Sequence, residues 1–555
     1  MNTRRRVWLA GAAVAVLAAA SYVNTLDGGW VWDDASSVLM HRHVQDPSKI
    51  GRLFLEDQHA FGMGQGNFYR PLLSVTFMAD YLLSGGPVPA AGDAAAKPRT
   101  DLPTLVFHLD SIAWHVLAAV LLLALLLRLG APPAAAAGAA AVFAVHPLHT
   151  EAVAYISGRA DMMSAVFMFA ALLLFLSRSA GARRALPWGA GLLCLVCALL
   201  SKESSLIFPV LLAVVLGVDW AARRGDGESR PRAAAHFAPL AAAVAVVAGY
   251  AVLRATVLNF APEAAAAQAR PLGHRLLDAC QAFALYVRLL FAPTGLHMEW
   301  TLEGYPAWLA LPGAAALAGL AAVAVIAARA GRFRIAGGIV WFAAAWLPIS
   351  GVFPINAPLA EHWMYVPMAG FWWAFMEFLH RERGAVRHAA PAAALVLVAV
   401  LLPMTVARNA DWNDNERLFR ATLAENPASA RVHYNLAVTY EDVLGNPAGA
   451  RRHYEAALRT GKVTDEAETR LSLGRVLEQM NDHGAAAGEY ERVLGRGEGA
   501  PEVMVHAALG LGRCRLALGD WGGAMGVLQR LATREPGLLP EVERLFGAEP
   551  FSNLY

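Results

Sequence analysis

The chain opens with an apolar run that ends in two adjacent carboxylates, residues 7–34, VWLAGAAVAVLAAASYVNTLDGGWVWDD. The part from Val7 to about Tyr22 is long enough to cross a bilayer, for which ~17 to 25 apolar residues suffice. Three arginines precede it and no good small-residue cleavage site follows, so we expect an uncleaved first span whose N-terminus lies inside. Asp33 and Asp34 then stand where the chain first faces the far side of the membrane.

The composition extends this interpretation to most of the chain. Over 555 residues, 57% are hydrophobic and 16% charged, with a mean hydropathy of +0.41, which is too apolar for an ordinary soluble protein. The net charge of +2 gives no reason to expect a nucleic-acid partner. The four cysteines form neither a disulfide framework nor a metal quartet, and Cys194 and Cys197 lie inside an apolar run, which favours buried thiols over a redox motif.

Ten further apolar segments of crossing length are predicted, near residues 104–128, 133–148, 162–178, 185–201, 204–220, 236–255, 306–328, 335–353, 363–380 and 389–407. Arginines gather in alternate connecting loops, as cytoplasmic loops require. The apolar segment 276–292 would reverse this alternation if it crossed, so we expect it to be an interfacial or re-entrant helix. The chain then has about 11 spans, and its C-terminal part lies on the side opposite the N-terminus.

Two regions outside the spans have a distinct character. The first outer loop, residues 24–103, is expected to hold helices on the membrane surface and an Ala/Gly/Pro-rich linker at 85–98. Beyond residue 408 the chain changes to charged, Ala-rich amphipathic segments that repeat. We therefore divide the chain into a membrane domain, 1–408, and a repeat domain, 409–555.

The repeats show in matched positions. Asn435-Leu436-Ala437 aligns with Ser472-Leu473-Gly474 and Gly510-Leu511-Gly512, and the small residues Ala450, Ala486 and Ala524 follow about 12 positions later. Tyr454, Tyr490 and Leu528 come next in the three units. Small residues where paired helices approach closely, followed by a large one, are typical of tetratricopeptide repeats, whereas a generic helical bundle needs no such match. The predicted fold is all-α: a polytopic membrane bundle with a C-terminal α-solenoid.

Four polar clusters are predicted at junctions between the membrane and the outside. They are Asp33-Asp34; His146-Pro-Leu-His149-Thr-Glu151 with Gly158-Arg159-Ala160-Asp161; Ser201-Lys202-Glu203-Ser204-Ser205; and Glu361-His362-Trp363-Met364-Tyr365-Val366-Pro367. Ionisable residues at membrane depth cost several kcal/mol unless they are paired or hydrated, so a set on one side indicates a shared polar cavity. Arg159 and Lys202 offer the charge that a phosphate needs, and the aspartates offer a general base.

Each cluster also has a purely structural interpretation. The acidic pair could be a loop within an aromatic belt. His146 and His149 have the spacing of helical metal ligands, but Pro147 between them disfavours a regular helical metal site. Lys202-Glu203 could be a snorkelling pair at a helix end, and Glu361-His362 could cap a helix. Structural roles at all four places would leave their common position unexplained.

The order of motifs resembles a known family. Trp32-Asp33-Asp34, Phe68-Tyr69-Arg70-Pro71, the run from His146 to Asp161, Ser201-Lys202-Glu203 and the run from Glu361 to Pro367, followed by the repeats, are together similar to the transmembrane and tetratricopeptide-containing (TMTC) O-mannosyltransferases. The resemblance implies a GT-C membrane glycosyltransferase that moves a mannose-like sugar from a polyprenyl-phosphate donor to a hydroxyl group, such as a protein serine or threonine, on the non-cytoplasmic face. It also implies that the acidic pair is the catalytic base and acceptor site.

One departure from the family concerns the last of these motifs, the run from Glu361 to Pro367. Where Glu-Arg-Tyr is expected, this chain has Glu361-His362-Trp363, so the cation at 362 is weaker and depends on pH. We predict metal-independent transfer with no cofactor, catalysed by Asp33 and Asp34. The predicted donor-phosphate ligands are Arg159, Lys202, Arg70 and His362, and the predicted supporting residues are His146, His149, Glu151, Asp161, Glu203, Glu361 and Tyr365.

The expected partners are a polyprenyl-phosphate-linked sugar, a protein acceptor held by the repeats, and the lipid bilayer. The Ala-rich composition and short loops favour a bacterial inner membrane, with the repeats periplasmic or extracellular. Two rival functions are a membrane-anchored scaffold without catalysis, which leaves the polar clusters unexplained, and a lipid or sugar transporter. A transporter should carry its polar residues near the midplane, often at broken helices.

Overall fold

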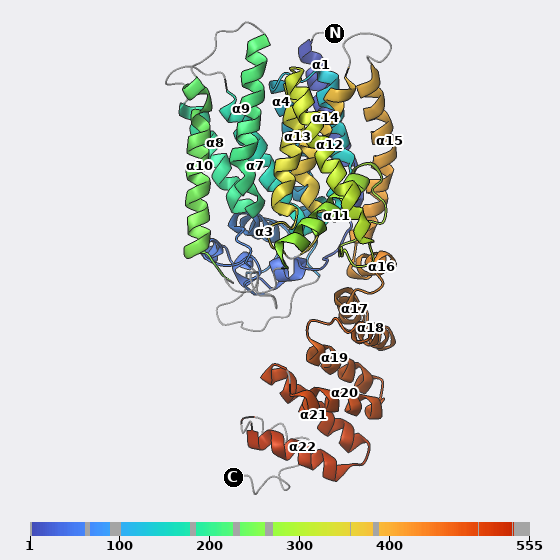
Figure 1. The fold of residues 1–555 in the computed structure, drawn as a ribbon. Helices are drawn as coiled ribbons and strands as arrows, with labels where there is room; N and C mark the ends of the chain where they lie inside the picture. Colours follow the sequence, from blue (N-terminus) through green and yellow to red (C-terminus); the bar gives the residue numbers. More distant parts are fainter. Residues whose placement is uncertain are drawn as a thin grey trace. The chain divides into compact units, whose positions relative to one another are not determined.

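The computed structural model describes residues 3–61, 67–88, 101–177, 185–225, 233–260, 270–355, 357–380, 388–497, 499–534 and 537. All regular elements in these residues are helical, which confirms the predicted all-α class (Figure 1). The chain forms two compact units, Met1–Asp414 and Asn415–Tyr555, and this division falls close to the boundary expected after residue 408. Most of the predicted linker at 85–98 and three arginine-rich loops, at 178–184, 226–232 and 381–387, lie outside the described residues.

The first unit is a bundle of apolar helices. They are α1 (Thr3–Ala20), α4 (Leu105–Arg128), α5 (Pro133–Val145), α7 (Ala160–Phe175), α8 (Ala185–Ser201), α9 (Phe208–Gly225), α10 (Ala233–Thr256), α11 (Leu272–Phe291), α12 (Ala310–Arg329), α13 (Phe333–Trp346), α14 (Tyr365–Leu379) and α15 (Ala389–Asn409). Each predicted span coincides with one of them. Among the described residues, seven helical stretches are long and apolar enough to cross a membrane: Arg4–Thr25, Leu105–Arg128, Ile156–Phe175, Glu203–Arg223, Ala233–Thr256, Ala307–Arg329 and Ala389–Trp412.

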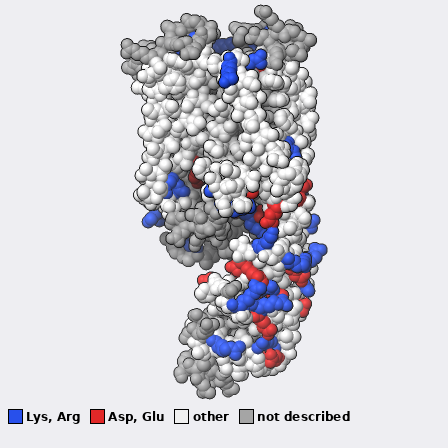
Figure 2. Space-filling view, viewed as in Figure 1, with Lys and Arg blue, Asp and Glu red and all other residues white. Residues whose placement is uncertain are grey.

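The other four predicted spans, near 133–148, 185–201, 335–353 and 363–380, fall on helices of 13, 17, 14 and 15 residues. The number of eleven spans therefore stays a prediction. Figure 2 shows a belt of uncharged residues on the first unit, with charged groups at its two ends. Such a belt is the surface expected next to lipid.

The two ends of this unit differ. At one end, which we call the arginine end, Arg128 pairs with Asp219 (3.1 Å) and Arg334 pairs with Glu377 (2.8 Å). At the other, which we call the site end, lie the turns that hold the acidic pair, Lys202 and the other predicted clusters. This end also holds α3 (Pro71–Leu83), a helix within the first outer loop.

The path of α11 is that of a helix that enters the bundle and returns. Its first turn lies at the site end, because Arg275 donates a hydrogen bond (2.6 Å) to the carbonyl of Val352, beyond the end of α13. Its last residue, Phe291, packs edge-on against Trp372 within α14, with ring centroids 5.9 Å apart. The chain then comes back, and Gln281 in the middle of α11 donates to the carbonyl of Pro306 (3.3 Å). This path supports the expectation that 276–292 does not cross.

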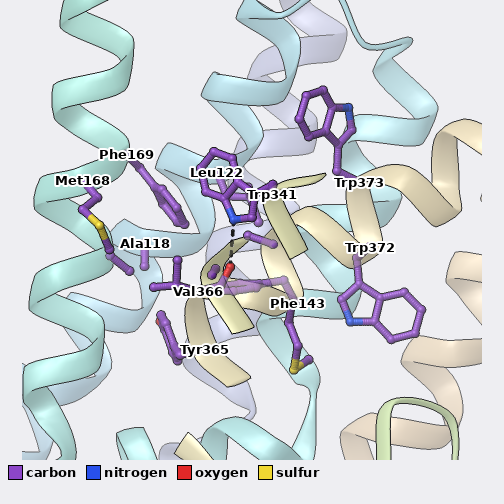
Figure 3. Close-up of a cluster of buried hydrophobic side chains, with 14 of the residues drawn as sticks. Ala118, Leu122, Phe143, Met168, Phe169, Trp341, Tyr365, Val366, Trp372 and Trp373 are labelled. Carbon is purple, nitrogen blue, oxygen red and sulfur yellow. Dashed lines mark hydrogen bonds between the residues drawn. The ribbon is translucent and has the colours of Figure 1, made fainter. Parts of the chain in front are cut away.

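Close packing of α13 on α14 fixes the helix that carries the last polar cluster. A Cβ atom on Gly338 would lie 2.7 Å from the carbonyl oxygen of Gly370, so glycine is required where these helices meet. Trp341 fills the core beside them and donates from Nε1 to the carbonyl of Val366 (3.0 Å; Figure 3). The N-terminus of α14, with Tyr365, is thereby held in place.

The second unit consists of antiparallel helix pairs: α16 (Asn415–Glu425), α17 (Ala430–Val438), α18 (Pro447–Arg459), α19 (Glu466–Gln479), α20 (His483–Arg496), α21 (Pro501–Ala517) and α22 (Trp521–Arg534). The predicted small residues Ala450, Ala486 and Ala524 are fully buried. Tyr490 lies between two helices, where a Cβ atom on either Gly474 or Gly510 would come within 2.5 Å of its ring. The repeat packing expected from the matched residues is confirmed.

Candidate functional site

The acidic pair divides into a buried and an accessible carboxylate. Asp34 has no exposed surface, and its Oδ1 accepts hydrogen bonds from the backbone N–H (2.9 Å) and hydroxyl (2.8 Å) of Ser157. Its Oδ2 accepts from the N–H of Val31 (3.2 Å). Burial raises the pKa of Asp34 to about 7 despite these donors, and the charge of Asp33 adds to the rise. Asp33 is only half-buried, so it is the more accessible member of the pair.

The loop that begins at Gly29 and holds Asp33 and Asp34, here called the acidic loop, is connected to Arg70 by a short segment, Asp57-Gln58-His59. No sequence pattern predicted a role for this segment. His59 Nδ1 lies 3.3 Å from the hydroxyl of Ser36, and Gln58 Oε1 accepts from Arg70 (3.3 Å). Burial lowers the pKa of His59, and Arg70 lowers it further, while Asp33 and Asp57 oppose the change. His59 is therefore mainly a neutral ring at neutral pH, placed between the charges of the carboxylate and the arginine.

Arg70, Lys202 and their predicted neighbours come together at the site end. Arg70 Nε lies 3.1 Å from Glu203 Oε2, and the backbone N–H of Tyr69 donates to Oε1 of the same carboxylate (3.1 Å). Lys202 Nζ lies 2.6 Å from Asp161 Oδ2. Arg70 and Lys202 thus each have a carboxylate partner. Arg70 also contacts Gln58, in the segment that connects it to the acidic loop.

A further cation, Arg254, joins this cluster from the end of α10. It donates to the backbone and side-chain oxygens of Asn67 (2.8 Å each), and its guanidinium lies 5.7 Å from the ring centre of Tyr69. Tyr250, one turn earlier, is buried, and its hydroxyl has no hydrogen-bond partner among the described residues. From the sequence, Arg254 is indistinguishable from a snorkelling residue at the end of an apolar helix.

Arg159 takes a different place from the one expected. Its side chain is fully buried, with Nη1 2.6 Å from Asp80 and 2.8 Å from Asp110, and Nη2 donates to the carbonyl of Phe107 (2.8 Å). A guanidinium enclosed by two carboxylates is neutralised and inaccessible. This geometry does not support the predicted contact with a donor phosphate, and it gives Arg159 a structural role.

His362 belongs to a second polar network. Its Nδ1 lies 2.9 Å from Glu151 Oε1, and the adjacent Glu361 pairs with Arg408 (3.3 Å), which also contacts Asp411 (2.8 Å). These partners differ from those around Lys202, whose electrostatic neighbours are Asp161, Arg70 and Glu203. The four cations expected to bind one phosphate are therefore distributed over separate environments, and only Arg70 and Lys202 lie together.

The two predicted histidines are buried hydrogen-bonding groups at the turn after α5. His146 Nε2 lies 3.1 Å from the carbonyl oxygen of Leu290, and His149 Nδ1 lies 2.9 Å from that of Phe143. The hydroxyl of Tyr365 bonds to His115 (2.8 Å). Within the described ranges, no group of three or more His, Cys, Asp or Glu side chains could hold a metal ion. His146 and His149 therefore stabilise the turn that follows α5.

Comparison with known proteins agrees with this arrangement of helices and repeats. A tetratricopeptide repeat family model matches residues 407–462, 441–501 and 471–538. The chain is 24% identical over 437 residues to the protein O-mannosyl-transferase F38B6.6 of Caenorhabditis elegans, covering 76% of this chain and 58% of the relative. It is also 24% identical to the protein O-mannosyl-transferase TMTC3 of Mus musculus, covering 85% and 53%.

A shorter match, 31% identical over 198 residues, relates 34% of the chain to 20% of the protein O-mannosyl-transferase Tmtc2 of Drosophila melanogaster. The chain spans little more than half the length of the first two relatives. The resemblance suggested by the motifs is confirmed: over most of its length, this chain is similar to the TMTC protein O-mannosyl-transferases.

Proposed function

We propose that this protein is a membrane glycosyltransferase that moves a mannose-like sugar from a polyprenyl-phosphate donor to a hydroxyl group of a protein acceptor. The observation that carries the proposal is the juxtaposition at the site end of an accessible carboxylate, Asp33, and a cluster of cations. They are connected through Gln58 and His59, which contact both the acidic loop and Arg70. A base beside a phosphate-binding cluster is what transfer from a phosphate-linked sugar needs.

The proposed reaction has one bond-forming and one bond-breaking event at the anomeric carbon. Asp33 accepts the proton of the acceptor hydroxyl as the hydroxyl oxygen bonds to that carbon. The bond between the carbon and the phosphate oxygen breaks, and its electron pair leaves with the lipid phosphate. Asp34, held by three hydrogen bonds, orients the loop and does not itself meet the acceptor. The family resemblance alone implies inversion of configuration.

The proposed donor-phosphate site consists of Arg70, Lys202 and Arg254. Each charge-assisted hydrogen bond to a phosphate oxygen contributes ~1.5–3 kcal/mol. Glu203 and Asp161 hold the first two cations before the donor enters, at 3.1 Å and 2.6 Å. This set replaces the predicted set, because Arg159 is enclosed and His362 lies in another network.

We further propose that the site end faces away from the cytoplasm of a bacterial inner membrane and that the repeat unit, periplasmic or extracellular, holds the protein acceptor. The gathering of Arg128, Arg223 and Arg334 at the opposite end supports this orientation, because basic residues favour the cytoplasmic side. A repeat solenoid offers an extended surface suited to a polypeptide. A transporter would be expected to have its ionisable groups at mid-depth instead.

The test is transfer of radiolabelled mannose from polyprenyl phosphate to protein, using purified full-length protein and acceptor from native membranes. The parent should transfer label, and Asp33→Asn should transfer it ~10²- to 10⁴-fold more slowly. Asp46→Asn is the matched control, because Asp46 lies in the same outer loop and only caps a short helical turn. Equal loss in both variants, or equal activity in both, would exclude Asp33 as the base.

A further inference from the structure

The backbone at Trp32 is strained. Its φ angle is +49°, one of two positive values at non-glycine residues among those described. The left-handed region is unfavourable for an L-residue, and such a conformation persists only where its surroundings hold it. Since Trp32 immediately precedes the acidic pair, this conformation sets the direction in which Asp33 and Asp34 point.

Trp32 is held in place by a stack of three aromatic rings, in which it is the first and Tyr155 and Trp412 are the other two. Its ring stacks on Tyr155 with centroids 5.7 Å apart and an angle of 18°, and Tyr155 stacks in turn on Trp412 at 5.3 Å and 29°. Tyr155 lies two residues before Ser157, which binds Asp34. One short segment therefore fixes both the strained tryptophan and the buried carboxylate.

Trp412 closes the stack from the last turn of the first unit, Ala410–Trp412. The residue is 1% exposed, and the guanidinium of Arg408 lies 5.9 Å from its ring centre. The next carbonyl, that of Asn413, accepts a hydrogen bond of 2.7 Å from the N–H of Gly29, at the start of the acidic loop. The segment that leads into the repeat unit is thus attached to this loop directly, through the backbone hydrogen bond, and indirectly, through the stacking of Trp412 on Tyr155.

We propose that Trp412 is a positioning residue for the acidic pair, acting through Tyr155 to keep Trp32 in its left-handed conformation. This inference rests on the proposed glycosyl transfer and adds to it. A residue in the last helical turn of the membrane unit then also sets the geometry of the base. Removal of the indole leaves Tyr155 without support on one face, so Trp32 can relax and Asp33 can move away from the acceptor.

The experiment compares Trp412→Ala and Trp412→Phe with Trp373→Phe in the full-length protein. Trp373 is a matched control, since it is equally buried but packs in the core between α13 and α14. Misplacement of a base by about 1 Å costs ~10²-fold, so Trp412→Ala should lower kcat by ~10- to 100-fold with little change in KM for the donor. Trp412→Phe, which keeps a stacking ring, should restore most of the rate.

A double-mutant cycle distinguishes positioning from general destabilisation. In an Asp33→Asn background the base is already lost, so Trp412→Ala should cause no further fall in residual transfer. A full additional fall, or a loss of rate in Trp373→Phe as large as in Trp412→Ala, would overturn the inference.

Hydrogen exchange measured by mass spectrometry separates this result from failure of the proposed function. Trp412→Ala should speed exchange across residues 29–34 and leave α4 unchanged, whether or not the parent transfers sugar. Faster exchange in that loop supports the positioning role even if no transfer is found. Unchanged exchange there refutes it.

Discussion

Substituting the two adjacent aspartates by asparagine should give two different phenotypes, although their sequence context makes them look equivalent. An amide in a loop ordinarily keeps the size and most of the hydrogen bonding of a carboxylate. Asp34, however, accepts from three donors on Ser157 and Val31 with both of its oxygens. An asparagine has one acceptor oxygen, and its NH₂ group must face at least one of these donors.

The cost of Asp34→Asn follows from that mismatch. A buried donor left without an acceptor costs ~1–3 kcal/mol, a large part of the ~5–15 kcal/mol that stabilises a typical domain. Asp33→Asn changes a half-buried side chain and should fold like the parent. Its transfer rate should instead fall by ~10² to 10⁴, the usual contribution of a general base. Thermal unfolding in detergent and radiolabelled transfer measure the two effects separately.

The pH dependence of stability provides a second test of the structural role of Asp34. Its pKa is raised from 3.8 to about 7, chiefly by burial, so the folded protein holds this proton at a pH where the unfolded chain has lost it. The contribution to stability is fully present below the unfolded pKa and is lost as the pH rises through about 7. The Tm of the parent should fall across this window, and Asp34→Asn should flatten that part of the profile. An Asp34→Asn protein with parental Tm at every pH, together with an Asp33→Asn protein with parental rate, would refute this division of roles.

The remaining predictions concern charge and topology. Arg159→Ala leaves two buried carboxylates without their cation and should destabilise the protein by ~3–5 kcal/mol, seen as a lower Tm, with donor KM unchanged in the folded fraction. Lys202→Ala should reduce donor turnover ~10-fold or more, and Lys202→Arg should restore part of it. Alkaline phosphatase fused after Asp414 should be active and a cytoplasmic reporter there silent; the opposite result would reverse the proposed orientation. Cysteines placed at His274, in the first turn of α11, and at Gly304, after its end, should react with an impermeant reagent from the same side, whereas labelling from opposite sides would show that α11 crosses.

The helices and repeats could be predicted because their signals are local and periodic. The composition of an apolar run is enough to predict a helix within the membrane or the core. Small residues such as Ala450 and Ala486 recur at a fixed spacing where helices meet. The ionic partners could not be predicted in this way. Arg159 looked available because Asp80 and Asp110 come from separate segments, and only the folded chain brings them within 2.8 Å. A loop segment without periodicity, such as the one around His59, carries no sequence signal of its contacts.

The ion pairs around the proposed phosphate site have a consequence for catalysis. A sugar phosphodiester carries one negative charge, and the departing phosphate gains a second as the glycosidic bond breaks. Lys202 is held at 2.6 Å from Asp161 before the donor enters, and its attraction for the phosphate grows as the second charge develops. Interactions that strengthen only in the transition state raise kcat more than they lower KM. Lys202→Ala should therefore reduce kcat more than it raises the donor KM, and a variant with raised KM and parental kcat would show that Lys202 serves binding alone.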